Sequence, residues 1–220
     1  VATAPAMIAA LARQNAVPNP VRAGWTKALR ADFEGWIQPK ETPGAVKMEK
    51  VIGWLAETLP DDAILTNGAG NFAAFLHRYY SYRGFPTELA PTSGSMGYGF
   101  PAAISASLEH PGRRVVCVAG DGDIQMTLNE FSTAMQHGAT PITIVANNGQ
   151  YGTIRMHQER TYPGRVSGTR LASPDFAALA RAYGGHGERV ERTEDFPAAF
   201  ERAVASGKPA ICLLYTSDAA

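Results

Sequence analysis

The stretch from Val115 to Gly149 constrains the fold more than any other part of the sequence. It begins with the apolar and mostly β-branched run Val115–Ala119, which is typical of a buried strand, and a second such run spans Ile142–Ala146. Between the two runs, apolar residues recur at helical spacing, at Ile124, Leu128, Phe131 and Met135. The stretch therefore predicts a strand–helix–strand unit with parallel strands.

Small, oxygen-rich residues follow both predicted strands. The sequence Gly-Asp-Gly at 120–122 ends the first strand, and Asn-Asn-Gly at 147–149 ends the second. A helical crossover places the carboxyl ends of parallel strands on one edge of the sheet, where open α/β sheets bind ligands. Mg2+ prefers hard oxygen donors such as the Asp121 carboxylate and the Asn148 amide, and it shares them with phosphates. Because glycines allow close approach and helix starts attract anions, the pattern predicts a metal-bridged diphosphate.

The two clusters together resemble a known motif. Gly-Asp-Gly at 120–122, then the stretch Asp123–Ala146, then Asn-Asn at 147–148 is similar to the thiamine diphosphate-binding motif of thiamine-dependent enzymes. The continuation NNGQYGTIRMHQE at 147–159 looks like the version found in acetolactate synthase-like decarboxylases and carboligases. Asp-Gly by itself is ordinary turn chemistry, so the specificity lies in the spacing of the two clusters.

This resemblance implies a role for each residue of the two clusters. Asp121, the Asn148 side chain and the Gln150 backbone carbonyl would bind Mg2+. The implied contacts with the cofactor at this end are Gly120, Asp121, Gly122, Asp123, Asn148, Gln150, Tyr151 and Gly152. Asp123 departs from the Ser or Ala that is common in the family, and an acid beside a diphosphate is unfavourable unless its carboxylate points away. At the start of a helix, however, an aspartate is favourable.

A second glycine-rich segment, at 91–101, reads as a tight turn that leads into a helix near Pro101. In the family that the chain resembles, a Gly-x-Met-Gly turn binds the aminopyrimidine half of the cofactor. The resemblance implies that the Gly94 carbonyl accepts from the amino group and that Met96 holds the cofactor bent, with Ser95 between them. A methionine of the apolar core is the alternative.

The segment at 67–71, Asn-Gly-Ala-Gly-Asn, follows a short predicted strand at 63–66 and opens another helix. It lacks the third glycine of a dinucleotide-binding fingerprint, because position 73 is Ala. The resemblance implies a loop that touches the diphosphate, with Asn71 as the contact. Phe72 stands where many acetolactate synthases carry a His.

The resemblance places Ile154 and His157 in the substrate pocket. His157 stands where acetolactate synthases have a Trp, and a residue on the helix surface is the alternative. The polar loop at 160–173 is of a type that closes over a site. Its arginines could meet a carboxylate or could be solvated: Arg160, Arg165 and Arg170.

The alternation of helical and strand segments from Val46 onward predicts a three-layer α/β sandwich with a mainly parallel central sheet over 46–211. Residues 1–45 are helical and would connect to a preceding domain, or form a helical hairpin packed on the main domain. Residues 212–220 are atypical of the family and could be a non-native tail. The chain begins with Val, which suggests a fragment of a longer protein.

Composition excludes several classes of partner. The 220 residues carry 20 Lys plus Arg and 20 Asp plus Glu, so charge gives no case for nucleic acid. No stretch approaches the ~20 consecutive apolar residues of a membrane span, and the N-terminus does not resemble a secretory signal. The two cysteines do not make a disulfide framework, which is compatible with a reducing compartment, and we expect a cytoplasmic protein.

The resemblance implies an enzyme that uses thiamine diphosphate and Mg2+ to decarboxylate a 2-keto acid and to join the product to a second carbonyl. The activating glutamate would come from a pyrimidine-binding domain of a neighbouring subunit in a homodimer or homotetramer, and FAD could bind another domain. We therefore expect this chain alone to be inactive. A separately encoded subunit of a split decarboxylase and a non-catalytic α/β module are the alternatives.

Overall fold

The computed structural model describes residues 3–14 and 19–216, and the chain divides into the units Val1–Gln38 and Pro39–Ala220. The first unit contains helices α1 (Ala4–Ala12) and α2 (Pro20–Trp36), and Asn19 caps α2 by accepting from the Val21 N–H at 2.9 Å. Neither helix has a buried residue. The apolar side chains at helical spacing on α2 are all exposed: Trp25, Leu29, Phe33 and Trp36. Residues 1–2 and 15–18 of the predicted connector lie outside the described residues.

The second unit is built on a parallel sheet. Its six strands in the described residues pair in the order β2-β1-β3-β4-β6-β5, and every pair is parallel. The strands are β1 (Ile64–Asn67), β2 (Glu88–Leu89), β3 (Val115–Gly120), β4 (Ile142–Asn147), β5 (His186–Val190) and β6 (Ala210–Tyr215). The apolar runs that predicted β3 and β4 are buried along nearly their whole length, as expected for strands covered on both faces.

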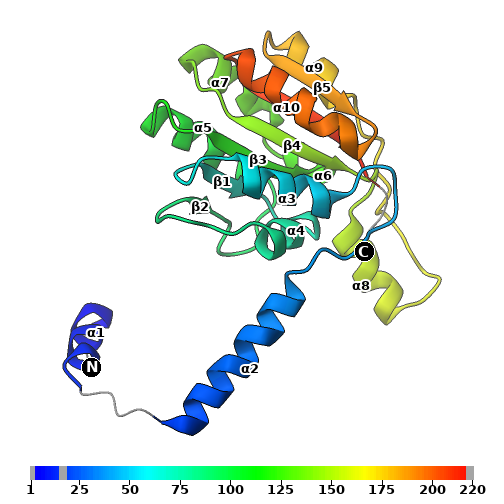
Figure 1. Ribbon diagram of the computed structural model, residues 1–220. Coiled ribbons are helices and arrows are strands. Elements are labelled where there is room, and N and C mark those ends of the chain that lie inside the picture. The colour runs from blue at the N-terminus through cyan, green and yellow to red at the C-terminus, as the bar shows by residue number, and fades with distance from the viewer. Residues whose placement is uncertain (1–2, 15–18, 217–220) are drawn as a thin grey trace. The chain divides into compact units, whose positions relative to one another are not determined.

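Helices cover both faces of this sheet (Figure 1). Side chains alternate along each strand, so Val116 and Val118 enter one core while Cys117 and Ala119 enter the other. The first core is closed by α3 (Met48–Thr58), α4 (Phe72–Tyr79) and α10 (Phe196–Ala205). The second is closed by α5 (Gly99–Glu109), α7 (Phe131–His137) and α9 (Phe176–Ala182). The predicted three-layer α/β fold with a parallel sheet is confirmed.

The strand order reverses between β1 and β3. From β1 the chain moves outward to β2, and it then returns to the other side of β1 to form β3 and β4. A reversal of this kind opens a crevice at the carboxyl ends of the two central strands. The segments that follow β1 and β3 therefore lie beside each other at the edge where a ligand is expected.

The prediction of one continuous helix after β3 is wrong, because the segment is interrupted. The segment contains α6 (Asp121–Ile124), a 3-10 turn over Leu128–Glu130 and then α7, because Thr127 leaves the helical region at φ −138° and ψ 18°. Its apolar side was predicted correctly, since Ile124 and Phe131 are buried in the second core. The interruption allows the Thr127 hydroxyl to donate to the Gly97 carbonyl at 2.9 Å.

The last strand, β6, crosses the boundary at Ile211 between the predicted cofactor-binding domain and the predicted atypical tail. Cys212–Leu214 are buried in β6, where Leu214 pairs with Ala146 of β4 and Val190 of β5. Residues 217–220 of the predicted atypical tail lie outside the described residues. Over residues 3–14 and 19–216, no helix combines the length and the apolar character needed to cross a membrane.

Contact between α9 and β5 gives a stability prediction. A Cβ atom added at Gly187 would lie 2.0 Å from the Ala177 carbonyl oxygen, so Gly187→Ala must push the helix away from the sheet. We expect the free energy of unfolding to fall by about 1–3 kcal/mol, the usual cost of overpacking. Urea denaturation followed by circular dichroism measures this change.

Gly53→Ala in α3 is the matched control, because a Cβ there meets nothing within 4 Å. Removing a helical glycine should raise the free energy of unfolding by about 0.5–1 kcal/mol. Equal effects of the two substitutions would contradict the close approach of α9 to β5.

Candidate active site at the carboxyl ends of the strands

One pocket collects most of the predicted site residues. It lies at the carboxyl ends of β1, β3 and β4. Of the residues proposed from the sequence, the pocket is lined by Asn71, Met96, Gly120, Asp121, Gly122, Asp123, Asn148, Gln150, Tyr151, Gly152 and Ile154. Gly94 and Ser95 are exposed in the same turn as Met96, and His157 does not line the pocket.

Asp121 is the buried carboxylate at the end of β3, with 2% of its surface exposed. Its Oδ1 accepts from the Gly122 N–H at 3.0 Å, and its Oδ2 accepts from the Gly149 N–H at 3.0 Å. The Ser173 hydroxyl also donates to Oδ2, at 2.6 Å. Asp121 thus joins the end of β3 to the loop after β4, as the two-cluster pattern predicts, and it is further joined to a distant segment.

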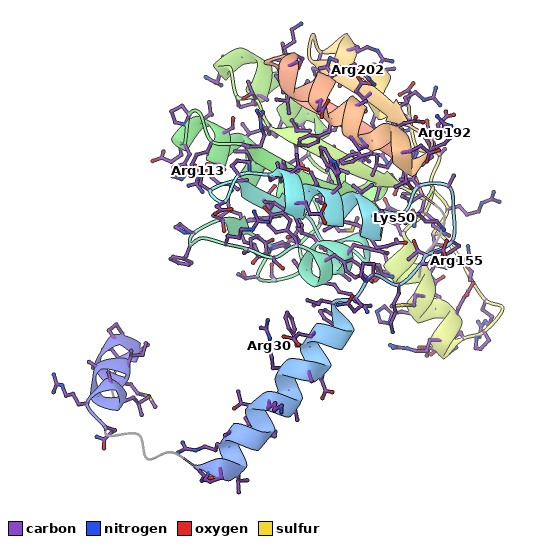
Figure 2. The ribbon with its side chains drawn as sticks, in the orientation of Figure 1. Arg30, Lys50, Arg113, Arg155, Arg192 and Arg202 are labelled. Carbon is purple, nitrogen blue, oxygen red and sulfur yellow. The ribbon has the colours of Figure 1, made fainter. Side chains whose placement is uncertain are left out.

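The loop after β4 presents further oxygen atoms. The Asn148 Oδ1 accepts from the Gln150 N–H at 3.2 Å, and the Gln150 carbonyl accepts from the Gly152 N–H at 3.0 Å. Gly149 has φ +68°, which allows the chain to reverse between them. Arg155, labelled in Figure 2, belongs to α8 (Gly152–Thr161). It donates to the Gln150 Oε1 at 2.8 Å.

These donors fit a hard cation. The residues proposed for the metal supply one carboxylate, one amide oxygen and one backbone carbonyl, which are the ligands that Mg2+ accepts alongside phosphate oxygens. Among the described residues, no group of three or more His, Cys, Asp or Glu side chains could hold a metal ion. A metal at this pocket would therefore be bound by the mixed oxygen set of Asp121, Asn148 and Gln150.

The floor of the pocket requires glycines. A Cβ atom at Gly120 would lie 2.8 Å from the Phe72 ring, and one at Gly122 would lie 2.5 Å from the Tyr151 ring. Phe72 and Tyr151 occupy the space that larger residues at 120 and 122 would need. The Gly-Asp-Gly sequence therefore brings its own backbone to the pocket surface, where a bulky anion could approach it.

The N-terminus of α8 faces the same pocket. Gly152, Thr153 and Ile154 line it, and the first turn of a helix carries N–H groups without helical partners, which favour an anion. Asn71 holds this turn in place, because its N–H donates to the Thr153 Oγ1 at 3.0 Å and its Oδ1 accepts from that hydroxyl at 2.9 Å. Asn71 therefore lies in the pocket, as the sequence suggested, and is bonded to α8.

The segment 169–173 lies in the polar loop at 160–173, which is of a type that closes over a site, and it contacts the candidate site. Its backbone pairs with the loop after β4, since the Tyr151 N–H donates to the Thr169 carbonyl and the Leu171 N–H donates to the Gly149 carbonyl, both at 2.8 Å. The sequence drew attention to the arginines of this region, whereas the structure brings Ser173 to Asp121. Asp175 caps α9 by accepting from the Ala178 N–H at 2.9 Å.

Two further differences concern the rim of the pocket. Ile154 lines the pocket with 48% of its surface exposed. His157 is also exposed, and its Nδ1 lies 2.9 Å from the Arg160 Nη2. Thr42 belongs to the predicted connector yet lines the pocket. The buried Glu49 holds it by accepting from the Thr42 N–H at 3.1 Å and from its hydroxyl at 2.7 Å.

Comparison with known proteins agrees with this arrangement. Residues 68–213 match the family model described as thiamine pyrophosphate enzyme, C-terminal TPP binding domain. The chain belongs to the thiamine pyrophosphate enzymes. This match begins directly after β1, ends within β6 and contains most of the pocket, which confirms the family that the Gly-Asp-Gly and Asn-Asn clusters indicated.

Relatives within the thiamine pyrophosphate enzymes include acetolactate synthases. The Haemophilus influenzae acetolactate synthase large subunit is 34% identical over 189 residues, covering 79% of this chain and 33% of that protein. The Saccharomyces cerevisiae mitochondrial catalytic subunit is 33% identical over 177 residues, covering 78% and 26%. The Rhodococcus jostii thiamine diphosphate-dependent 4-hydroxybenzoylformate decarboxylase superposes with a TM-score of 0.76 at 29% identity, covering 82% and 34%. The chain spans about a third or less of each.

The bond pair between Asn71 and Thr153 gives a second prediction. Thr153→Val keeps the shape of the side chain but leaves the Asn71 N–H and Oδ1 without this partner. We expect the free energy of unfolding to fall by about 1–2 kcal/mol. Thr161→Val is the control in urea denaturation, since Thr161 is exposed at the far end of α8. Equal effects at the two positions would show that the Asn71–Thr153 pair does not stabilise the site.

Proposed function

We propose that the chain binds thiamine diphosphate through Mg2+ as part of an acetolactate synthase-like enzyme. The enzyme would decarboxylate a 2-keto acid and join the product to a second carbonyl. One observation carries the proposal: Asp121, Asn148 and the Gln150 carbonyl meet at the ends of the adjacent strands β3 and β4, beside the N-terminus of α8.

Each part of the pocket has a task in this proposal. Asp121, Asn148 and Gln150 hold the metal, and the first turn of α8 binds phosphate oxygens through its N–H groups. Met96 and the Gly94 carbonyl hold the aminopyrimidine half. Ile154 contacts the substrate at the rim. Thiamine diphosphate, held by these residues, would supply the nucleophilic carbon and the electron sink that decarboxylation of a 2-keto acid requires.

We further propose that the site is completed by another part of the enzyme. Among the described residues, the carboxylates that line the pocket are Asp121 and Asp123, and both accept hydrogen bonds from backbone N–H groups. Neither is placed to activate the aminopyrimidine. A glutamate from a pyrimidine-binding domain of a neighbouring subunit would supply that group, in a homodimer or homotetramer. FAD, if present, would bind another domain.

Calorimetric titration of the chain with thiamine diphosphate tests the proposed binding. We expect binding in the presence of Mg2+ and its loss when the metal is removed by a chelator. Asp121→Ala should weaken binding at least about tenfold, since the metal then loses its only charged ligand from the chain. Asp61→Ala is the control, because Asp61 is exposed and pairs with Arg83 away from this pocket.

Absence of binding by the folded wild-type chain would contradict the proposal. That outcome would favour a non-catalytic α/β module, the alternative that keeps the fold without the cofactor. Binding that is equally strong in Asp121→Ala would instead move the metal away from the end of β3.

The incomplete site gives a fourth prediction. Pyruvate incubated with the chain, thiamine diphosphate and Mg2+ should release no CO2 and form no acetolactate above the rate without protein. The physical reason is that the pocket lacks a free carboxylate that could activate the cofactor. Release of CO2 by the chain alone, lost in Asp121→Ala, would show that the chain carries a complete active site.

A further inference from the structure

Asp123 is a buried carboxylate that the metal-binding scheme does not use. Only 3% of its surface is exposed, and its Oδ1 accepts from the Gly97 N–H at 2.8 Å and from the Ala69 N–H at 3.1 Å. Burial raises the pKa of Asp123 above its ordinary value, and hydrogen bonds from the N–H groups of Gly97, Ala69 and Gly120 act in the opposite direction. The carboxylate thus joins α6, at the end of β3, to two separate loops of the chain.

Gly68 provides the space for this carboxylate. A Cβ atom at Gly68 would lie 1.9 Å from the Asp123 Oδ2 and 2.2 Å from its Cγ. The two positions therefore depend on each other, because any larger residue at 68 would displace the Asp123 side chain. An acid beside a diphosphate is unfavourable unless its carboxylate points away. The Asp123 Oδ1 is bound instead by the backbone N–H groups of Gly97 and Ala69.

The segment 123–127 bonds to both the N–H and the carbonyl of Gly97. Its N–H donates to Asp123, while its carbonyl accepts from the Thr127 hydroxyl at 2.9 Å. Gly97 has φ +81°, and a Cβ atom there would lie 2.7 Å from the Met126 Cβ. Asp123 and Thr127 therefore hold the two peptide groups on either side of the Gly97 Cα, and the interruption between α6 and α7 places Thr127 where its hydroxyl can reach Gly97.

We propose that Asp123, assisted by Thr127, is a positioning residue that sets the distance between the two halves of the cofactor site. Asp123 lies two residues after Asp121, which holds the metal and diphosphate, and it fixes Gly97, which directly follows Met96. The proposal rests on the function proposed above. It assigns to the Asp123 side chain a task in joining the diphosphate half to the aminopyrimidine half, and no direct contact with either.

Two probes separate the halves of the site. Thiamine diphosphate engages both, whereas inorganic pyrophosphate engages the diphosphate half alone, and each is titrated calorimetrically into the 220-residue chain with Mg2+. Asp123→Ala should weaken thiamine diphosphate binding by about tenfold or more, the scale of lost hydrogen bonds to a charged group. Pyrophosphate should bind the variant as tightly as the wild type or more tightly, because one negative charge near the diphosphate is removed.

A conservative substitution at position 123 should restore the affinity for thiamine diphosphate. Asp123→Asn keeps an Oδ1 that accepts from Gly97 and Ala69, so it should recover most of the affinity for thiamine diphosphate.

Thr127→Val removes only the bond to the Gly97 carbonyl and should weaken thiamine diphosphate binding by a few fold without changing pyrophosphate binding. Thr133→Val is the control, since the Thr133 hydroxyl donates to Glu130 within its own segment, and should change neither.

The outcomes distinguish this proposal from the function on which it rests. If the wild type binds neither probe, the proposed function fails. If the wild type binds both and Asp123→Ala still binds thiamine diphosphate as tightly, the positioning role is overturned. Equal losses for both probes would show a general structural role and would also overturn it. If Asp123→Ala is unfolded by circular dichroism, Thr127→Val decides, and its unchanged affinity for thiamine diphosphate would overturn the proposal.

Discussion

Parallel pairing of β3 with β4 is the constraint on which the site depends. Gly120 pairs with Ala146, so the residues that follow each strand emerge at the same level of the sheet edge. The Asp121 carboxylate then accepts from the Gly149 N–H in the loop after β4. The reversal of strand order beside β1 leaves a crevice at this edge of the sheet. A shift of β4 by one residue would separate Asp121 from Asn148 and remove the oxygen cluster.

The two buried aspartates of this edge perform different tasks. Both are buried, and each accepts hydrogen bonds from backbone N–H groups, which contribute roughly 1.5–3 kcal/mol when the acceptor is a charged carboxylate. Asp121 faces the pocket together with Asn148 and suits a metal. Asp123, two residues on, serves the backbone of Gly97 and Ala69. One short helix therefore carries both the proposed metal ligand, Asp121, and the residue that connects the two loops, Asp123.

Much of this arrangement could be predicted from the sequence, because local patterns carry it. Buried strands follow from the apolar runs at 115–119 and 142–146, and the site follows from the polar clusters that end them. Contacts between distant residues could not be predicted in this way. The contacts of Ser173 with Asp121 and of Asn71 with Thr153 each depend on how loops fold back, which periodicity does not encode. The break at Thr127 was missed for the same reason, since the bond that it allows joins Thr127 to the distant Gly97.

The central claim is that Asp121 and Asn148 hold the metal of a bound diphosphate at the end of β3 and β4. A crystal structure of the chain grown with thiamine diphosphate and Mg2+ tests it most directly. The account predicts a metal ion in contact with the Asp121 carboxylate, the Asn148 amide oxygen and the Gln150 carbonyl, with the diphosphate at the first turn of α8. A diphosphate bound elsewhere, or a metal that does not touch Asp121, would contradict the account.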